Sequence, residues 1–389
     1  MSDYTLIDSS AALKELAAIL LTEKVVAFDT EADSFYHYFD KVCLLQIATR
    51  KHVYLIDPLA LDDPKGLRPL GAVFAAKNIR KIFHAAEYDI YVLKRECSFR
   101  FANLFDTAIC AQLLGYPSIG LAALGQRHFE VMLPKDEQRS DWSRRPLTEQ
   151  QLRYAVADVV YLIPLAEKLE RELDRAGRMA WAEEEFAAVC RREWPPREFD
   201  KLGYLRIKGA RSLDPQALSI LRELYLMRDK RAREADRPAF KVLGNRTMIE
   251  IAEQQPDTLE QLRKIKGVTD LILRRLGRDV MAALARGGKK RHGPLPKAPG
   301  SGKRRMDRAT ERRLAVLKRW RATRAAELAL DPGVFCPNSA LEAIAGRHPQ
   351  NARELSELEL KGWFRRDFGA EVLQTLAEAE PDPEGSSAP

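Results

Sequence analysis

Three short apolar runs near the N-terminus constrain the fold of this chain more than any other feature. They read VVAF (25–28), VCLLQIAT (42–49) and HVYLIDP (52–58), and polar segments of turn length separate them. Short runs rich in β-branched and aromatic residues, bounded by turn-forming residues, predict strands. We therefore expect an antiparallel meander at the start of a sheet.

The pattern after the meander alternates and then becomes helical. LRPLGAVFAA has helical spacing, IRKIFHAA is a short strand, and YDIYVLKREC is helical again. The stretches from LFDTAICAQLLG to ELDRAG continue as helices, the last of them with Thr148 as N-cap and Gln151 three residues later. The sum predicts an α/β domain with a mixed sheet over residues 1–195.

No strand signal persists beyond that domain. LRELYLMRDKRAREADRPAF aligns with LAVLKRWRATRAAELALDPGVF, and each copy then runs through a short helix to another proline. Two copies of one small helical domain explain this spacing. We place them at 205–286 and 306–378, joined by a basic Gly/Pro-rich linker (287–305) and followed by a disordered tail (379–389).

The charge is unevenly distributed along the chain. Residues 1–180 hold 23 Lys/Arg against 25 Asp/Glu, whereas the remaining residues hold 41 against 31. This asymmetry suits a catalytic module followed by a module that meets a polyanion. Ordinary helix-surface chemistry plus a basic linker is the alternative, and charge alone does not choose between them.

The cysteines and the N-terminus indicate the compartment. The five cysteines are scattered and never in CxxC spacing, which gives no support to a zinc site or a disulfide framework. The first residues lack a basic leader, and no apolar run approaches the ~20 residues that span a bilayer. We expect a cytoplasmic protein without a membrane partner.

Two acidic residues, Asp29 and Glu31, follow the run VVAF at the end of the first predicted strand. Side chains at i and i+2 on a strand point to the same face. Two acids held there repel one another unless a cation lies between them, and Mg²⁺ or Mn²⁺ prefers such oxygen ligands. Two solvated acids in a turn are the simpler interpretation of this pair alone.

Tyr154 and Asp158 stand one turn apart on one face of an apolar helix. A carboxylate on such a helix is partly desolvated and needs a partner, for which Arg153 is one candidate. Asp89 follows a predicted strand at a helix start, where the macrodipole favours an acid. Each of these residues has an ordinary structural interpretation when it is taken singly.

Together the acids form an ordered set, DxE, then H-A-x3-D, then Y-x3-D, within one domain. This set resembles the tyrosine-bearing subgroup of the DEDD exonuclease superfamily. The stretches FDTEADSFYHYFDKVCLLQIAT, HAAEYDIYVL and SDWSRRPLTEQQLRYAVADVVYL are similar to the ribonuclease D family. The two helical repeats look like HRDC domains, so the resemblance covers nearly the whole chain and implies a ribonuclease-H-like exonuclease domain.

The resemblance also implies a mechanism, which is phosphodiester hydrolysis with two divalent metal ions, Mg²⁺ or Mn²⁺. Asp29 is implied to bridge both ions, Glu31 and Asp158 to complete one site, and Asp89 to support the other. Two cations roughly 4 Å apart stabilise the attacking and leaving oxygens together. Tyr154 is implied to orient the attacking water, and the products to be nucleoside 5′-monophosphates.

Four further residues are candidates for substrate contacts. His84, on the strand leading to the third acid, is a candidate for contact with the scissile phosphate or the terminal ribose. Trp142, Arg144 and Arg145 precede the tyrosine-bearing helix and are candidates for stacking on, or pairing with, the strand. A core histidine and a tryptophan that pins the segment to the core are the structural alternatives.

The expected substrate is RNA, with transfer-RNA precursors the first candidate by resemblance. A 3′→5′ DNA exonuclease of the proofreading or repair type is the alternative, because the same metal centre serves both and 2′-hydroxyl contacts are not visible in sequence. A nucleic-acid-binding scaffold with an inactive nuclease fold conflicts with the intact set of five residues. The chain lacks GxxxxGK[ST], so neither a helicase role nor a nucleotide cofactor is expected.

Overall fold

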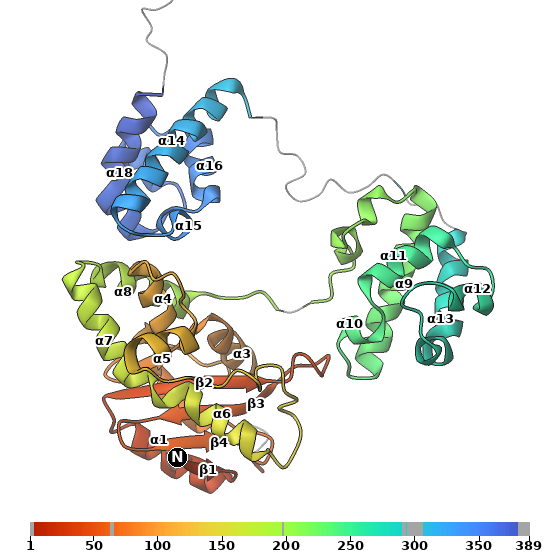
Figure 1. Cartoon of the computed structure of the whole chain (residues 1–389), viewed down its shortest axis with the longest axis horizontal. Coiled ribbons are helices and arrows are strands. Elements are labelled where there is room, and N and C mark those ends of the chain that lie inside the picture. Colours follow the sequence, from red (N-terminus) through yellow and green to blue (C-terminus); the bar gives the residue numbers. More distant parts are fainter. Residues whose placement is uncertain (1–3, 63–65, 197, 290–292, 294–305, 380–389) are drawn as a thin grey trace, which may run out of the picture. The chain divides into compact units, whose positions relative to one another are not determined.

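The computed structural model of the chain describes residues 4–62, 66–196, 198–289, 293 and 306–379 (Figure 1). The chain divides into two compact units. One consists of Met1–Glu31, Val42–Glu193 and Lys303–Pro389, and the other of Ala32–Lys41 and Trp194–Gly302. Most of the predicted linker (287–305) and of the predicted tail (379–389) lies outside the described residues. The domain boundaries drawn from the sequence stay predictions.

Six strands form one mixed sheet in the order β1-β4-β3-β2-β5-β6. The strands are β1 (Tyr4–Ile7), β2 (Val25–Ala32), β3 (Val42–Ala48), β4 (Val53–Ile56), β5 (Arg80–Phe83) and β6 (Leu104–Asp106). β3 and β4 are antiparallel, whereas β1 pairs with β4, β2 with β5, and β5 with β6 in parallel. The predicted mixed sheet is confirmed.

The two edge strands are absent from the sequence-based expectation. β1 leaves three of its four residues exposed, so it has no hydrophobic alternation to detect. The first residues of LFDTAICAQLLG were predicted to be helical, and this is wrong, since they form β6. Asp106 is both the last residue of β6 and the N-cap of the next helix, so no loop marks the change.

Eight α-helices accompany the sheet in the described part of the first 193 residues. They are α1 (Ser10–Leu20), α2 (Gly71–Ala75), α3 (Glu87–Cys97), α4 (Thr107–Leu113), α5 (Leu121–Phe129), α6 (Glu149–Val160), α7 (Leu162–Arg175) and α8 (Met179–Arg191). The sequence predicted α6 and α7 as one helix, and this is wrong. Pro164 has no N–H to donate to a carbonyl of the preceding turn, and it lies in the first turn of α7, where such a bond is not needed.

Helix α6 packs against β3 and β4, and α7 packs against β5 and α4 (Figure 1). A cluster of aromatic rings forms part of the core around Phe28 of β2. The ring centroids of Phe28 and Phe74 are 4.7 Å apart, and those of Phe28 and Phe83 are 5.4 Å apart. Phe28 immediately precedes Asp29, so this packing fixes the end of β2 that carries the acids.

Beyond residue 214, the described residues form helices that repeat one plan twice. The first copy contains α9 (Pro215–Glu234), α10 (Ala239–Val242), α11 (Asn245–Gln254), α12 (Leu259–Arg263) and α13 (Asp270–Gly288). The second contains α14 (Arg308–Glu327), α15 (Pro332–Phe335), α16 (Asn338–Arg347), α17 (Ala352–Ser356) and α18 (Gly362–Ala377). The first four helices agree pairwise in length, at 20, 4, 10 and 5 residues. The predicted repeat is confirmed.

The second copy packs against α8 within its own unit. The rings of Trp181 and Trp363 stack with centroids 4.4 Å apart. The indole N–H of Trp181 donates to Asp367 at 2.6 Å, and that of Trp363 donates to Glu185 at 2.8 Å. Each buried indole thus has a polar partner on the other side of the contact. None of the described helices combines the length and the apolar character needed to cross a bilayer.

Candidate metal centre and active site

The first two acids, Asp29 and Glu31, lie on β2 as predicted. Their side chains share one face of the strand because they are two residues apart. Both are half-buried. The strand therefore fixes the spacing of two carboxylates on a backbone that the core holds in place.

Tyr154 and Asp158 lie on α6, one turn apart. The Thr148 hydroxyl accepts from the amide of Gln151, and the Gln151 side chain accepts from the amide of Thr148, so the predicted N-cap is a complete capping box. Arg153, the alternative partner of Asp158, pairs with Glu149 instead. Helix α6 therefore places the Asp158 side chain near the sheet without an ion pair to a described Lys or Arg.

Three of the acids converge in space. One carboxylate oxygen from each of Asp29, Glu31 and Asp158 lies within 4.8 Å of the others. The three come from a strand and a helix that are more than a hundred residues apart in sequence. Oxygen-only ligand sets of this kind suit Mg²⁺ or Mn²⁺ rather than zinc.

The fourth acid, Asp89, lies in the first turn of α3 and is 6% exposed. The Thr30 hydroxyl donates a hydrogen bond to its carboxylate at 2.5 Å. Thr30 stands between the two acids of β2, so this bond ties Asp89 to the strand that carries them. Asp89 is thus next to the three convergent acids without belonging to their immediate group.

The turn before α3 depends on a residue that the sequence analysis did not single out. Ala85 has φ 58°, in the left-handed region. The buried carboxylate of Asp106 accepts from the amides of Ala85 at 3.0 Å and Ala86 at 2.8 Å. It also accepts from the amides of Ala108 and Ile109 at the start of α4. Asp106 therefore holds the turn that leads from His84 to Asp89.

A repeated tripeptide was the signal for these supporting residues. FDT occurs at 28–30 and again at 105–107. In each copy the aspartate faces the site or its supporting turn, and the threonine bonds a candidate residue. Thr30 donates to Asp89, and the Thr107 oxygen lies 2.9 Å from Nδ1 of His84.

The four carboxylates are electrostatically unfavourable as they stand. Burial raises the pKa of Asp29 well above its ordinary value, and the charges of the other three acids raise it further. Burial and the nearby charges of two acids do the same to the pKa of Glu31. Burial raises the pKa of Asp89 and of Asp158 to about 7. Among the described residues, no ion pair involves any of the four, so the group lacks a compensating cation.

The Tyr154 phenol stands beside these acids. Burial first, and then the charges of Asp158 and Glu31, raise its pKa above the ordinary value, so the phenol is neutral. The phenol and the Asp158 carboxylate lie one turn apart on α6. A neutral hydroxyl that donates to one group can still accept from another. It can therefore orient a neighbouring O–H.

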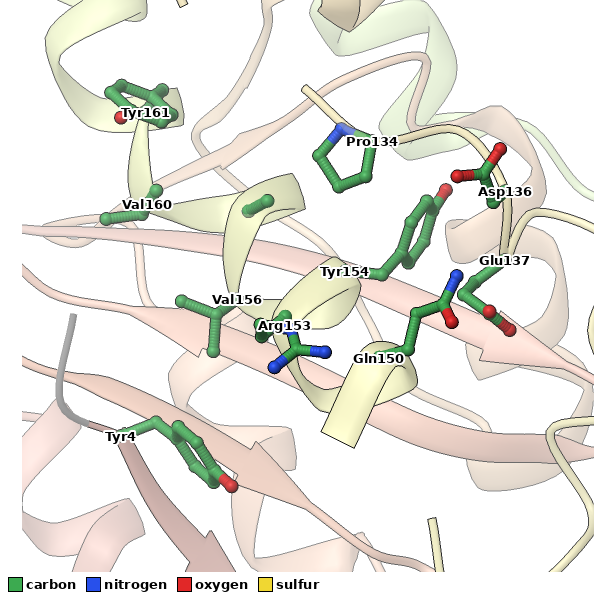
Figure 2. A pocket seen from close by; sticks show the side chains of 11 residues that line it. Tyr4, Pro134, Asp136, Glu137, Gln150, Arg153, Tyr154, Val156, Val160 and Tyr161 are labelled. Atoms are coloured by element: carbon green, nitrogen blue, oxygen red, sulfur yellow. The ribbon is translucent and has the colours of Figure 1, made fainter. Parts of the chain in front are cut away.

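A pocket of about 500 Å³ opens over the acids. Asp29, His84, Tyr154 and Asp158 line it together with side chains from 118–123 and 133–138. A second, more apolar hollow of about 570 Å³ shares Pro134 and Tyr154 with it. Figure 2 shows this second hollow, with Pro134 and Tyr154 on one side and Tyr4 of β1 on the other.

Of the four residues expected to contact substrate, His84 alone lines the pocket with the acids. Trp142 is 1% exposed, and its ring lies 5.9 Å from that of Tyr154. Arg145 donates to both oxygens of Asp57, at 2.5 and 2.6 Å. Arg144 is 81% exposed and pairs with Asp141. Trp142 is thus packed in the core and Arg145 is paired with Asp57, and contact of either residue with substrate stays a prediction.

The comparison with known protein families agrees with this arrangement. Residues 4–174 match the family described as 3′-5′ exonuclease, and residues 217–284 and 310–376 match the HRDC domain. The exonuclease match contains all five residues of the candidate centre. The HRDC matches coincide with the two helical copies.

Individual relatives are similar along nearly the whole chain. The chain is 30% identical to the ribonuclease D of Nitrobacter hamburgensis, over 95% of this chain and 94% of that protein. It is 31% identical to the ribonuclease D of Pseudomonas paraeruginosa, over 92% and 93%. The crystal structure of Escherichia coli RNase D, described as an exoribonuclease involved in structured RNA processing, superposes with a TM-score of 0.68 at 26% identity, over 97% of this chain and all of that one.

Proposed function

This chain belongs to the ribonuclease D family, and we propose that it hydrolyses RNA from the 3′-hydroxyl end at the centre formed by Asp29, Glu31, Asp89, Tyr154 and Asp158. The observation that carries the proposal is the convergence of three carboxylates within 4.8 Å without a described cation to neutralise them. Such a group is costly in a folded protein unless a ligand compensates it. This electrostatic cost to folding is explained if the compensating ligand takes part in the reaction.

The donor set fits divalent metal ions. Asp29, Glu31 and Asp158, whose oxygens converge, would hold one ion, and Asp29 together with the neighbouring Asp89 would hold a second. Two divalent ions would supply positive charge to the attacking and leaving oxygens of the phosphodiester. Mg²⁺ and Mn²⁺ are the ions that such carboxylates favour.

Tyr154 has a positioning task for the nucleophile. Its hydroxyl is neutral, and its oxygen lone pairs can accept a hydrogen bond from a water molecule. Its raised pKa argues against a free phenolate as general base. Water adds to the terminal phosphorus while the bond to the preceding 3′-oxygen breaks. The products are a nucleoside 5′-monophosphate and a chain with a new 3′-hydroxyl.

RNA is the substrate that the relatives indicate, and structured RNA is the class named for the Escherichia coli structure. We extend this to transfer-RNA precursors as the first candidates. The two HRDC copies would bind the structured part of such a molecule through phosphate contacts that weaken with salt. All five cysteines are free thiols, which fits the reducing cytoplasm that we propose as the compartment.

The test is a time course on RNA and DNA of one sequence, each labelled at the 5′ end, with and without divalent metal. The proposal expects a ladder that shortens one nucleotide at a time from the RNA 3′ end, released 5′-monophosphates, and no reaction in a chelator. A uniform preference for DNA would overturn the RNA assignment. Internal cleavage would overturn the exonucleolytic one.

A further inference from the structure

His84 occupies a position in the pocket that the mechanism above does not use. It follows the last residue of β5, precedes the left-handed Ala85, and lines the pocket together with Asp29 and Asp158. Its ring is partly buried. The histidine therefore faces the space where the end of a bound strand would lie next to the acids.

The bonds of Thr107 decide which nitrogen of His84 carries the proton. The Thr107 hydroxyl donates to the carbonyl oxygen of Phe83 at 3.1 Å. A carbonyl can only accept, and a hydroxyl has one proton to give. The Thr107 oxygen must then accept from the ring, so the contact of 2.9 Å with Nδ1 of His84 is an N–H donated by the histidine.

A neutral ring protonated at Nδ1 has a bare lone pair at Nε2. Burial lowers the pKa of His84 to about 4, so the ring is neutral at the pH where the enzyme would work. No described residue bonds Nε2. The pocket therefore presents a fixed hydrogen-bond acceptor, not a cation, beside the carboxylates.

This acceptor limits what the substrate can place there. Phosphate oxygens carry no proton, so they are poor partners for a lone pair. Ribose hydroxyls and some base N–H groups can donate. The terminal ribose is attached directly to the scissile phosphate, whereas the base stands farther from it, so a sugar hydroxyl is the nearer donor to a group lining the pocket with Asp29.

We propose that Nε2 of His84 accepts a hydrogen bond from a hydroxyl of the 3′-terminal ribose, and that Thr107 enforces this by holding the ring in one tautomer. The inference rests on the proposed function, because it assumes that the strand end lies over the acids. It gives His84 a specificity role and excludes the scissile phosphate as its partner.

The test uses oligonucleotides that are RNA throughout except for the last sugar, which is ribose, 2′-deoxyribose or 3′-deoxyribose, each with adenine or uracil as the terminal base. Removing the hydroxyl that His84 binds should slow wild-type single-turnover release of the last nucleotide about tenfold. His84→Asn keeps a donor to Thr107 but has no acceptor at the Nε2 position, so it should lose that discrimination. His84→Gln places an amide oxygen near Nε2 and should recover part of it.

Thr107 provides an independent pair of variants. Thr107→Val removes the oxygen that fixes Nδ1 and should weaken the sugar discrimination, although this side chain is 0% exposed and lies behind the histidine. Thr107→Ser keeps the oxygen and should behave like the wild type. A merely structural role would slow all three terminal sugars equally in both His84→Asn and Thr107→Val, and this would overturn the proposal.

Two other outcomes also overturn it: equal wild-type rates on all three sugars, or a His84→Asn effect that follows the terminal base instead of the sugar. Loss with either the 2′- or the 3′-deoxy end supports the proposal and identifies the hydroxyl. Failure of the proposed function would look different, because the wild type would then release no 5′-monophosphate from all-ribose RNA with metal present.

Discussion

Two groups of buried carboxylates lie close together in the exonuclease domain, and they differ in how their charge is compensated. Asp106 is 2% exposed and accepts from four backbone amides. In the other group Asp89 is buried and Asp29, Glu31 and Asp158 are half-buried, and none of the four has an ion pair among the described residues. Thr30 supplies one hydroxyl to Asp89.

This difference indicates that Asp106 has a structural role, whereas the four acids have a chemical one. Burial raises the pKa of Asp106, but hydrogen bonds from four backbone amides lower it in part, so this carboxylate stabilises the turn and the helix start that it joins. In the other group burial raises the pKa of all four acids, and the charges of neighbouring acids raise those of Asp29 and Glu31 further, which is an electrostatic cost that a bound cation would relieve. Removing the charge of Asp29 should therefore lower activity and not stability, whereas removing the charge of Asp106 should chiefly lower stability.

The largest effect is expected from Asp29→Asn. The variant removes one carboxylate charge from the residue that we assign to both metal sites. We therefore expect metal-dependent release of 5′-monophosphates to fall by at least about a thousandfold, equivalent to several kcal/mol of lost transition-state stabilisation. RNA binding should be largely retained, and the free energy of unfolding without metal should not decrease. Asp174→Asn, an exposed acid on α7, is the matched control and should keep full activity.

Tyr154→Phe should have the next largest effect. The ring can keep its packing against Trp142, but the hydroxyl that we assign to the water is lost. We expect single-turnover rates to fall by about a hundredfold, within the range for a positioned proton-transfer or orienting group. Tyr161→Phe is the control. Wild-type rates in Tyr154→Phe would show that the phenol is dispensable.

Asp106→Asn should invert the pattern seen with Asp29→Asn. A neutral amide accepts fewer hydrogen bonds, and several buried amides lose a charged partner, so the free energy of unfolding should fall by about 2–3 kcal/mol in urea. Turnover should fall only about tenfold, through misplacement of Asp89 and His84. An abolished activity at unchanged stability would place Asp106 in the chemistry and break the comparison.

The pH dependence of stability without metal should show the smallest effect. The folded-state pKa values of Asp89 and Asp158 are raised to about 7, so the folded protein binds more protons than the unfolded chain above the ordinary pKa of an aspartate. Stability in a chelator should therefore fall as the pH rises from about 5 to 8. Melting temperatures should show a drop of a few degrees.

Mn²⁺ should reverse that drop, and Asp158→Asn should flatten it. A melting temperature that rises over the same pH range in the chelator would contradict the assignment of raised pKa values to these acids.

For five residues the local sequence pattern alone predicted which strand or helix carries the side chain. Asp29 and Glu31 lie on a strand, Tyr154 and Asp158 on one helix face, and Asp89 at a helix start, because each position depends on periodicity within a few residues. Their convergence was inferred from order and resemblance. No local rule states that a strand and a helix more than a hundred residues apart will meet.

The supporting residues could not be predicted because their roles depend on tertiary contacts. Asp106 is the last residue of a strand of only three residues, and its four amide partners come from two different turns. Arg145 looks like a surface cation in sequence, but its guanidinium donates to Asp57, which lies 88 residues away in sequence. In both cases at least one partner lies 20 or more residues away in sequence.

The most direct test of the central claim is the number of Mn²⁺ ions bound per chain at equilibrium, measured by dialysis or by the loss of the free-ion electron paramagnetic resonance signal. We expect about two ions for the wild type, as in other two-metal sites, and strongly reduced binding in Asp29→Asn, with Asp174→Asn unchanged. A wild-type protein that binds no Mn²⁺, or an Asp29→Asn variant that binds it equally well, would contradict the assignment of these four acids as a metal centre.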